Sequence, residues 1–205
     1  MSNLHKFQTE SDYYASMLAS PSVSLVAATN AVHYDSDGKS PSSTPMLGDL
    51  KITYNVDSTS AAVTLFNKST GSGSGSGSEF MPYQMWVDGV EVTPTDVYVF
   101  STIGNHIVEY NIGSSDIPNA FKDITTIVKV EIGENITYLS SEAFMGCNSI
   151  NEVTCYCINS PSFGGENVFT SYSIPLYIPS TANIGSYEIE YWVTRWNMNL
   201  YAIKA

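Results

Sequence analysis

The feature that most constrains the fold is a repeat in the C-terminal part of the chain, where Ala120-Phe121 returns 23 positions later as Ala143-Phe144. Both copies follow the pattern A-F-x-x-[IC]-x-x-I-x-x-V-x-[IC], and a third, degenerate copy covers residues 168–179. A fixed period of this size is typical of solenoid proteins, in which each unit buries its apolar face only by stacking on the next. The repeat therefore favours a stacked recognition or scaffolding surface over an enzyme pocket.

Each copy is expected to hold a short helical turn around the Ala-Phe pair, followed by a strand. In the first copy, Val128, Val130 and Ile132 alternate with Lys129 and Glu131. Because successive side chains of a strand point to opposite faces, this alternation predicts one apolar face and one polar face.

The phrase A-F-x-G-C-x-S-I-x-x-V at residues 143–153 resembles the BspA-like leucine-rich repeats of Bacteroides and related bacteria. The resemblance covers roughly residues 115–205, with residues 160–179 similar to a last repeat and residues 186–203 similar to a closing cap. It implies a short leucine-rich-repeat solenoid with a C-terminal cap. In such a cap Tyr191, Trp192 and Trp196 would supply the apolar area that shields the open end, with a ligand role as the alternative.

Residues 49–114 are expected to form a separate β-sandwich domain with Ig-like strand logic. Apolar alternation predicts six short antiparallel strands, at residues 50–56, 61–66, 84–87, 90–92, 97–100 and 106–112. Asp88-Gly89 between two of them is a strong signal for a two-residue hairpin. The last strand leads directly into the first repeat, so the sheet is able to continue into the repeats.

A Gly/Ser run interrupts this domain at residues 70–80, and its composition is that of a flexible, disordered loop. Glu79-Phe80 at its end is what an EcoRI cloning scar would encode. In that case Met81 begins a second polypeptide fused to the first; otherwise the run is a natural low-complexity loop.

Residues 1–34 are expected to form an N-terminal docking or assembly segment, with a helix at residues 9–18 and strands at 22–26 and 32–34. Residues 35–48 form a polar linker, in which Asp35 and Asp37 begin a calcium-loop pattern that lacks its later acids. The phrases K-F-x-T-x-x-x-Y, P-x-V-S and V-x-Y in this segment resemble the opening of Bacteroides-phage virion proteins. The N-terminal residues do not have the pattern of a secretory signal, and no apolar run is long enough to span a membrane. For repeats of a kind found on bacterial surfaces, this combination favours release as part of a phage particle.

Composition argues against several classes of function. Acidic residues outnumber basic ones by 20 to 8, without a basic cluster, so binding to nucleic acid is not expected. Catalytic fingerprints are missing, and His33 and His106 lie in expected strands as structural residues. The three cysteines, Cys147, Cys155 and Cys157, fit buried apolar positions, so no metal, no cofactor and no enzyme activity is expected.

The expected fold is mainly β, a small Ig-like sandwich followed by the capped repeats, and binding is the expected function. The candidate binding surface consists of Lys129, Glu131, Tyr138, Glu152, Thr154, Tyr156 and Tyr177, with Tyr172 as a further exposed tyrosine. The resemblances imply a virion structural protein (fibre, appendage or capsid decoration). Its expected partners are other virion proteins, further copies of itself (a trimer being natural for a fibre), and a host-surface protein or glycan. The alternatives are a BspA-like bacterial surface adhesion protein and a carbohydrate-binding accessory module.

Overall fold

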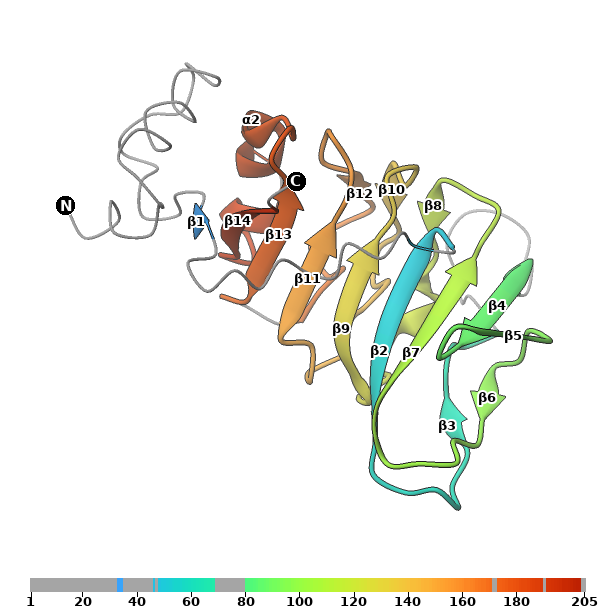
Figure 1. Cartoon of the computed structure of the whole chain (residues 1–205). Coiled ribbons are helices and arrows are strands. Elements are labelled where there is room, and N and C mark those ends of the chain that lie inside the picture. The colour runs from blue at the N-terminus through green and yellow to red at the C-terminus, as the bar shows by residue number, and fades with distance from the viewer. Residues whose placement is uncertain are drawn as a thin grey trace.

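The computed structural model describes residues 33–34, 46, 48–68, 80–170, 173–189 and 191–203, and this part of the chain is mainly β. A nine-stranded mixed sheet dominates it (Figure 1). From one edge to the other its strands are β1 (His33–Tyr34), β14 (Asn199–Ile203), β13 (Pro175–Pro179), β11 (Glu152–Cys155), β9 (Ile127–Ile132), β2 (Leu50–Val56), β7 (Gly104–Asn111), β4 (Gln84–Val87) and β5 (Val90–Val92).

Smaller elements lie beside this sheet. They are the parallel ladder β12 (Ser162–Phe163), β10 (Tyr138–Leu139) and β8 (Asp116–Ile117), the antiparallel pair β3 (Val63–Thr64) and β6 (Val97–Tyr98), the 3₁₀ helix η3 (Asn119–Phe121), and the helices α2 (Ile184–Ile189) and α3 (Tyr191–Thr194). None of the helices in the described ranges is long and apolar enough to cross a membrane.

The sequence repeat corresponds to the step between parallel strands. Lys129 of β9 lies opposite Glu152 of β11, and Thr154 of β11 lies opposite Tyr177 of β13. The repeated phenylalanines stack in the interior as well: the ring centroids of Phe121 and Phe144 are 5.5 Å apart, and those of Phe144 and Phe169 are 5.1 Å apart. Each repeat therefore adds one strand to the large sheet and one ring to an aromatic stack.

Four of the six strands expected to form a separate sandwich, β2, β4, β5 and β7, lie in the same sheet as the repeat strands, whereas β3 and β6 pair with each other in a separate sheet. β2 pairs antiparallel with β7 on one side and with β9 on the other, so hydrogen bonds cross the expected boundary near residue 114. The Asp88-Gly89 hairpin is confirmed: Val87 and Val90 are paired, and both turn residues have positive φ, at 49° and 80°. Such a turn matches the twist of the flanking strands.

Two details of the first repeat and the cap bear on the core. Val128, which the alternation grouped with Val130, is only half-buried, whereas Ile127 is fully buried. The prediction is wrong there because the β2–β9 register shifts between Thr53 and Tyr54, which lets Ile127 take the inward position. In the cap, Trp192 and Trp196 are fully buried and pack on each other at 5.8 Å, as predicted.

Several expectations lie outside the described residues. They are the helix at residues 9–18, the strand at residues 22–26, the calcium-like start at Asp35 and Asp37, the Gly/Ser run at residues 70–78, and Tyr172. The short strand expected at residues 32–34 is present as β1, which pairs in parallel with β14.

Candidate binding surface

A single row of cross-strand neighbours runs over eight of the nine strands of the sheet, on the face opposite the core. We call it the cross-strand row. From β5 to β14 it contains Glu91, Trp86, Glu109, Lys51, Glu131, Thr154, Tyr177 and Tyr201. Directly opposite residues in a sheet are close enough for their side chains to interact. The row therefore forms one continuous strip of mostly polar and aromatic side chains.

The centre of the row is a charged network of alternating sign. Glu131 Oε2 lies 3.1 Å from Lys51 Nζ, and Glu131 Oε1 lies 3.4 Å from Lys129 Nζ. Lys129 Nζ also lies 2.7 Å from Glu152 Oε1, and the Tyr156 hydroxyl donates to Glu131 Oε2 at 3.0 Å. The network thus joins β2, β9 and the end of β11 through their side chains as well as their backbones.

Burial and charge act together on the titration of this network. Burial on its own lowers the pKa of Lys129, but the hydrogen bond and charge of Glu152 and the charge of Glu131 outweigh it and raise the pKa. Burial, followed by the Glu131 carboxylate, raises the pKa of Tyr156. Lys129 stays a cation and Tyr156 stays a neutral donor throughout the physiological range.

Thr154 stands next to the charged network and differs from its neighbours. Its side chain is fully buried, and within the described part of the chain Oγ1 has no hydrogen-bond partner. A buried hydroxyl without a partner costs roughly 1–3 kcal/mol. Because Thr154 is fully buried, its hydroxyl is a local cost to stability and is not open to a ligand in this conformation.

The β13–β14 end of the row is aromatic. The rings of Tyr177 and Tyr201 stack with their centroids 5.2 Å apart and their planes 30° apart, and both side chains are half-buried. A tyrosine pair of this kind offers a rigid apolar surface with polar edges, which suits sugars and protein side chains alike.

The structure brings six of the seven predicted surface residues together: Lys129, Glu131, Glu152, Thr154, Tyr156 and Tyr177. Tyr138 lies apart from them, in the β8–β10–β12 ladder. Glu131 and Thr154 were expected on the solvent side but are 5% and 0% exposed. For Glu131 the reason is plain, because Lys51, Lys129 and Tyr156 surround its carboxylate.

Sequence reasoning missed the members of the row that lie outside the repeats, namely Lys51, Trp86, Glu91, Glu109 and Tyr201. A signal for Lys51 was present, since it alternates with Leu50 and Ile52 and so had to lie off the apolar face. Its neighbours Glu109 and Glu131 are far away in sequence, and nothing local indicated which strands flank it.

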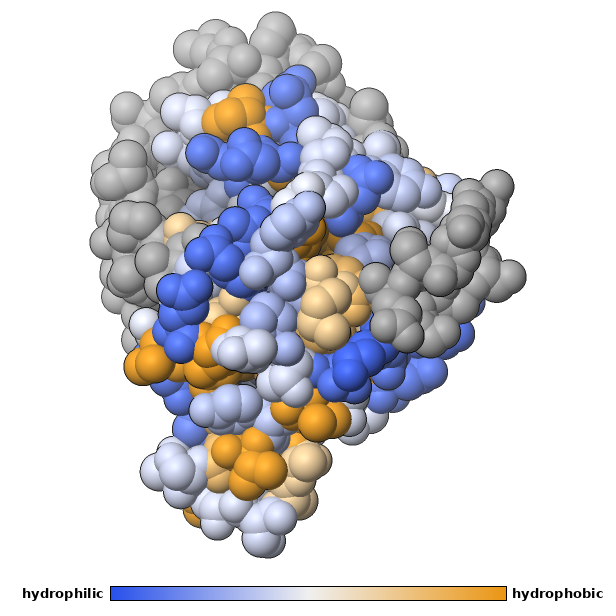
Figure 2. Space-filling view, turned by 90° about the vertical axis from the view of Figure 1, so that its right-hand side faces the viewer, coloured by the Kyte–Doolittle hydropathy of each residue, from blue (hydrophilic) through white to orange (hydrophobic). Residues whose placement is uncertain are grey.

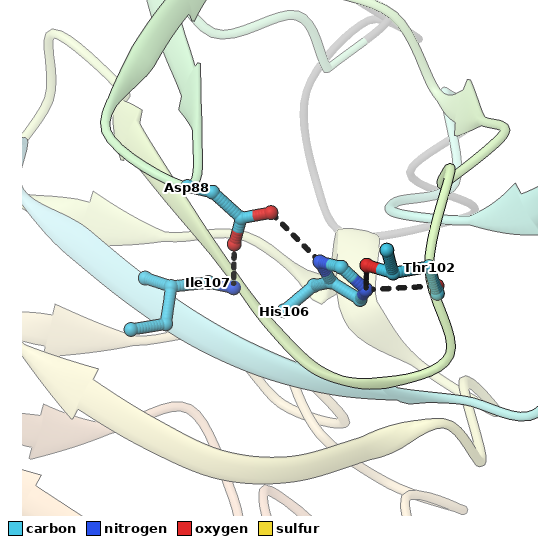
Figure 3. Close-up of polar contacts among 4 residues, drawn as sticks. All are labelled: Asp88, Thr102, His106 and Ile107. Atoms are coloured by element: carbon cyan, nitrogen blue, oxygen red, sulfur yellow. Dashed lines mark hydrogen bonds and ion pairs between the residues drawn. The ribbon is translucent and has the colours of Figure 1, made fainter.

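A second polar cluster surrounds His106 at the β4–β5 hairpin (Figure 3). His106 Nδ1 lies 2.7 Å from Asp88 Oδ2, and Nε2 lies 3.0 Å from the Thr102 carbonyl oxygen and 3.2 Å from Thr102 Oγ1. The other Asp88 oxygen accepts a hydrogen bond from the backbone N–H of Ile107. Both ring nitrogens of His106 are therefore engaged by oxygen atoms of the protein itself. The cluster therefore ties the hairpin to the loop before β7, as expected of a structural histidine.

The three cysteines are free and buried. Cys147 donates to the Phe121 carbonyl oxygen at 3.0 Å, and burial raises the pKa of its thiol to about 11. Cys157 donates to the Gly133 carbonyl oxygen, and Tyr187 donates to Cys155. All three act as core residues, as predicted. In the described ranges, His, Cys, Asp and Glu form no group of three or more that could hold a metal ion.

The β5 end of the sheet carries apolar side chains in contact with solvent. Viewed from this end, hydrophobic patches are interspersed with hydrophilic residues (Figure 2). The exposed large hydrophobic residues between positions 81 and 107 are Met81, Tyr83, Val90, Val97, Val99, Ile103 and Ile107. Because hydrophilic residues break up the patches, this end forms a weaker candidate surface than the cross-strand row.

No protein-family model matches the chain, and neither the curated proteins nor the solved structures contain a match to it. The residues of this face that remain accessible are Lys129 and Glu152 of the charged network and the half-buried Tyr177 and Tyr201.

Proposed function

We propose that the chain is a non-enzymatic structural and recognition protein, a virion component of a Bacteroides-infecting, crAss-like phage. It would serve as a fibre, appendage or capsid decoration, with residues 1–34 anchoring it in the particle. In this proposal, the strands from β2 to β7 correspond to an Ig-like sandwich whose sheet continues into the repeats. Residues 115–205 correspond to a BspA-like leucine-rich-repeat solenoid with a cap. The 23-residue step between paired strands, the stacked phenylalanines and the buried cap tryptophans support the repeat assignment.

The cross-strand row is the observation that carries the recognition role. It extends over eight strands of the sheet, and its more exposed members lie toward the two ends, a spacing that fits an elongated ligand such as a glycan chain or a strip of protein surface. Lys129 and Glu152, which are the more exposed members of the charged network, offer polar contacts, and Tyr177 with Tyr201 offers aromatic contact area. Host-surface glycans or proteins and neighbouring virion proteins are the proposed ligands.

The assembly role is tested by the mass and shape of the purified protein. Light scattering combined with small-angle X-ray scattering should show an elongated oligomer, with a trimer as the natural form for a fibre. Deletion of residues 1–31, which leaves β1 in place, should release monomers. A compact monomer before and after this deletion would overturn the proposal that the N-terminal segment drives assembly.

The alternative is a BspA-like bacterial cell-surface adhesion protein, which the same repeat geometry would serve. The two proposals differ in where the protein resides. An antibody against the purified chain should label phage particles grown on a Bacteroides host if the virion proposal is correct. Labelling confined to the surface of uninfected cells would favour the bacterial adhesion protein.

A further inference from the structure

In the sequence, the Gly/Ser run separates the central strand of the sheet, β2, from the two strands that flank it. β2 precedes residues 70–78, whereas β7 and β9 follow them. β2 pairs with β7 from Leu50–Tyr110 to Val56–Gly104, and with β9 from Leu50–Ile132 to Tyr54–Ile127. Without β2, the strands contributed by residues 80–203 would form two separate sheets with a strand-wide gap between β7 and β9 (Figure 1).

The described residues on either side of the Gly/Ser run, Lys68 and Phe80, lie next to each other. The backbone N–H of Phe80 donates to the Lys68 carbonyl oxygen at 2.8 Å. A link across such a short distance needs only a tight turn, so residues 69–79 are longer than closure requires. In general, a covalent link raises the effective concentration of the segment that it tethers.

Residues 48–68 contact the later part of the chain at both ends, through β2 and through residues 63–68. Leu50, Ile52, Tyr54 and Val56 of β2 are at most 2% exposed in the shared core. Further along, Leu65 N donates to the Asp96 carbonyl oxygen at 2.8 Å, and the Phe66 ring packs edge-on against Phe80 at 5.1 Å and Tyr110 at 6.1 Å. The buried apolar side chains of this segment therefore share one core with residues beyond the Gly/Ser run.

Polar groups at the start of β2 also interact with the segments on both sides of it. At the start of β2, Asp49 Oδ2 accepts from the Ile112 N–H at 3.0 Å, and the Asp49 carbonyl oxygen accepts from the Gly133 N–H at 2.8 Å. Lys51 lies opposite Glu109 on β7 and Glu131 on β9, and it pairs with Glu131 at 3.1 Å. A cationic strand residue between two acidic flanking residues is charge-complementary to the gap.

We propose that residues 80–203 form a strand-acceptor groove between β7 and β9, and that residues 48–68 are its ligand, able to bind as a separate polypeptide. The groove fits an extended peptide with apolar residues at alternate positions and a lysine between the first two. Recognition is β-strand addition, in which backbone hydrogen bonds supply affinity and the alternate side chains supply specificity. The inference does not depend on the virion proposal.

The first test cuts the link in the folded full-length protein. A protease recognition sequence replaces residues 72–78, and the protein is cleaved under native conditions. The two pieces should remain in one 1:1 particle by native mass spectrometry, with unchanged circular dichroism. Separation or unfolding after cleavage would overturn the proposal.

The second test supplies the strand in trans to the full chain carrying Ile52→Asp, which places a charge in the core position of its own strand. A synthetic peptide of residues 48–68 should bind this variant and raise its unfolding midpoint in a saturable manner. The peptide with Asn55→Ser, an exposed position, should act equally well, whereas the peptide with Ile52→Asp should bind at least about tenfold more weakly. If the variant is unfolded on its own, the wild-type peptide should restore its fold. Failure of the wild-type peptide to bind or restore it would overturn the proposal.

Discussion

Lys51 of β2 and Glu131 of β9 form a buried ion pair of 3.1 Å, with only 7% of each side chain exposed. The pair lies on the face of the sheet opposite the core, where the alternation predicted solvated side chains. It fixes the register of the central strand against the first repeat strand. It also holds Glu131 in place for Lys129 and Tyr156, so the charged centre of the row depends on it.

Removing one member of this pair should be costly. Glu131→Ala leaves Lys51 and Lys129 without their shared carboxylate, and breaking a buried pair in this way costs about 3–5 kcal/mol of unfolding free energy. The exposed pair Arg195–Glu166, at 3.5 Å, provides the control, because Arg195→Ala should cost less than about 1 kcal/mol. Urea unfolding of both variants measures the difference, and equal small losses would show that the Lys51–Glu131 pair is not buried as described.

Alkaline pH should weaken the fold through Lys129 and Tyr156. The pKa of each is raised above its ordinary value of 10.5 and 10.0, respectively, so the folded state retains protons that the unfolded state loses. Their contribution to stability is therefore complete below about pH 10 and is lost as pH rises through the folded pKa values. Tyr156→Phe removes one of the two groups, and its urea midpoint should fall less steeply above pH 10 than that of the wild type. Parallel slopes would contradict the assignment.

The aromatic stack makes a prediction about the repeats. Phe144 lies between Phe121 and Phe169 and is fully buried. Phe144→Ala should cost about 3–5 kcal/mol by leaving a cavity in the stack, while Phe144→Leu should cost clearly less. Thermal or urea unfolding measures both. A cost near zero for the alanine variant would mean that the repeats do not stack through this ring.

Thiol chemistry tests the burial of the cysteines. Cys147, Cys155 and Cys157 are at most 2% exposed, and the raised pKa of Cys147 keeps its thiol protonated. An aromatic disulfide reagent should therefore label no thiol in the native protein at neutral pH, and all three after unfolding in urea. Rapid labelling of the native protein would contradict this packing.

Local patterns in the sequence predicted several features of the local structure. The 23-residue period predicted which residues of successive repeats lie side by side, as Lys129 and Glu152 do. Asp88-Gly89 predicted its hairpin because few residue pairs accept two positive φ angles. The alternation from Leu50 to Val56 separated Lys51 from the core side chains.

Strand order could not be predicted in the same way. β2 lies between β7 and β9 because its apolar face completes their shared core, and such long-range pairing has no signature within β2 itself. The register shift that places Ile127, and not Val128, in the core also arises from the pairing of β2 with β9. The burial of Glu131 follows from Lys51, which reaches it only once β2 is in place. The candidate surface was therefore predicted for its repeat half and missed for its other half.

Recognition through the cross-strand row is tested most directly by binding to intact Bacteroides cells and to their purified surface glycans. Tyr177 and Tyr138 form a matched pair, since both are half-buried tyrosines in β-strands but only Tyr177 lies on the row. The wild type and Tyr138→Ala should bind alike, and Tyr177→Ala should bind about tenfold more weakly, as expected for loss of an aromatic anchor. Equal binding by the two tyrosine variants, or no binding by the wild type to any strain or glycan of the panel, would contradict the account.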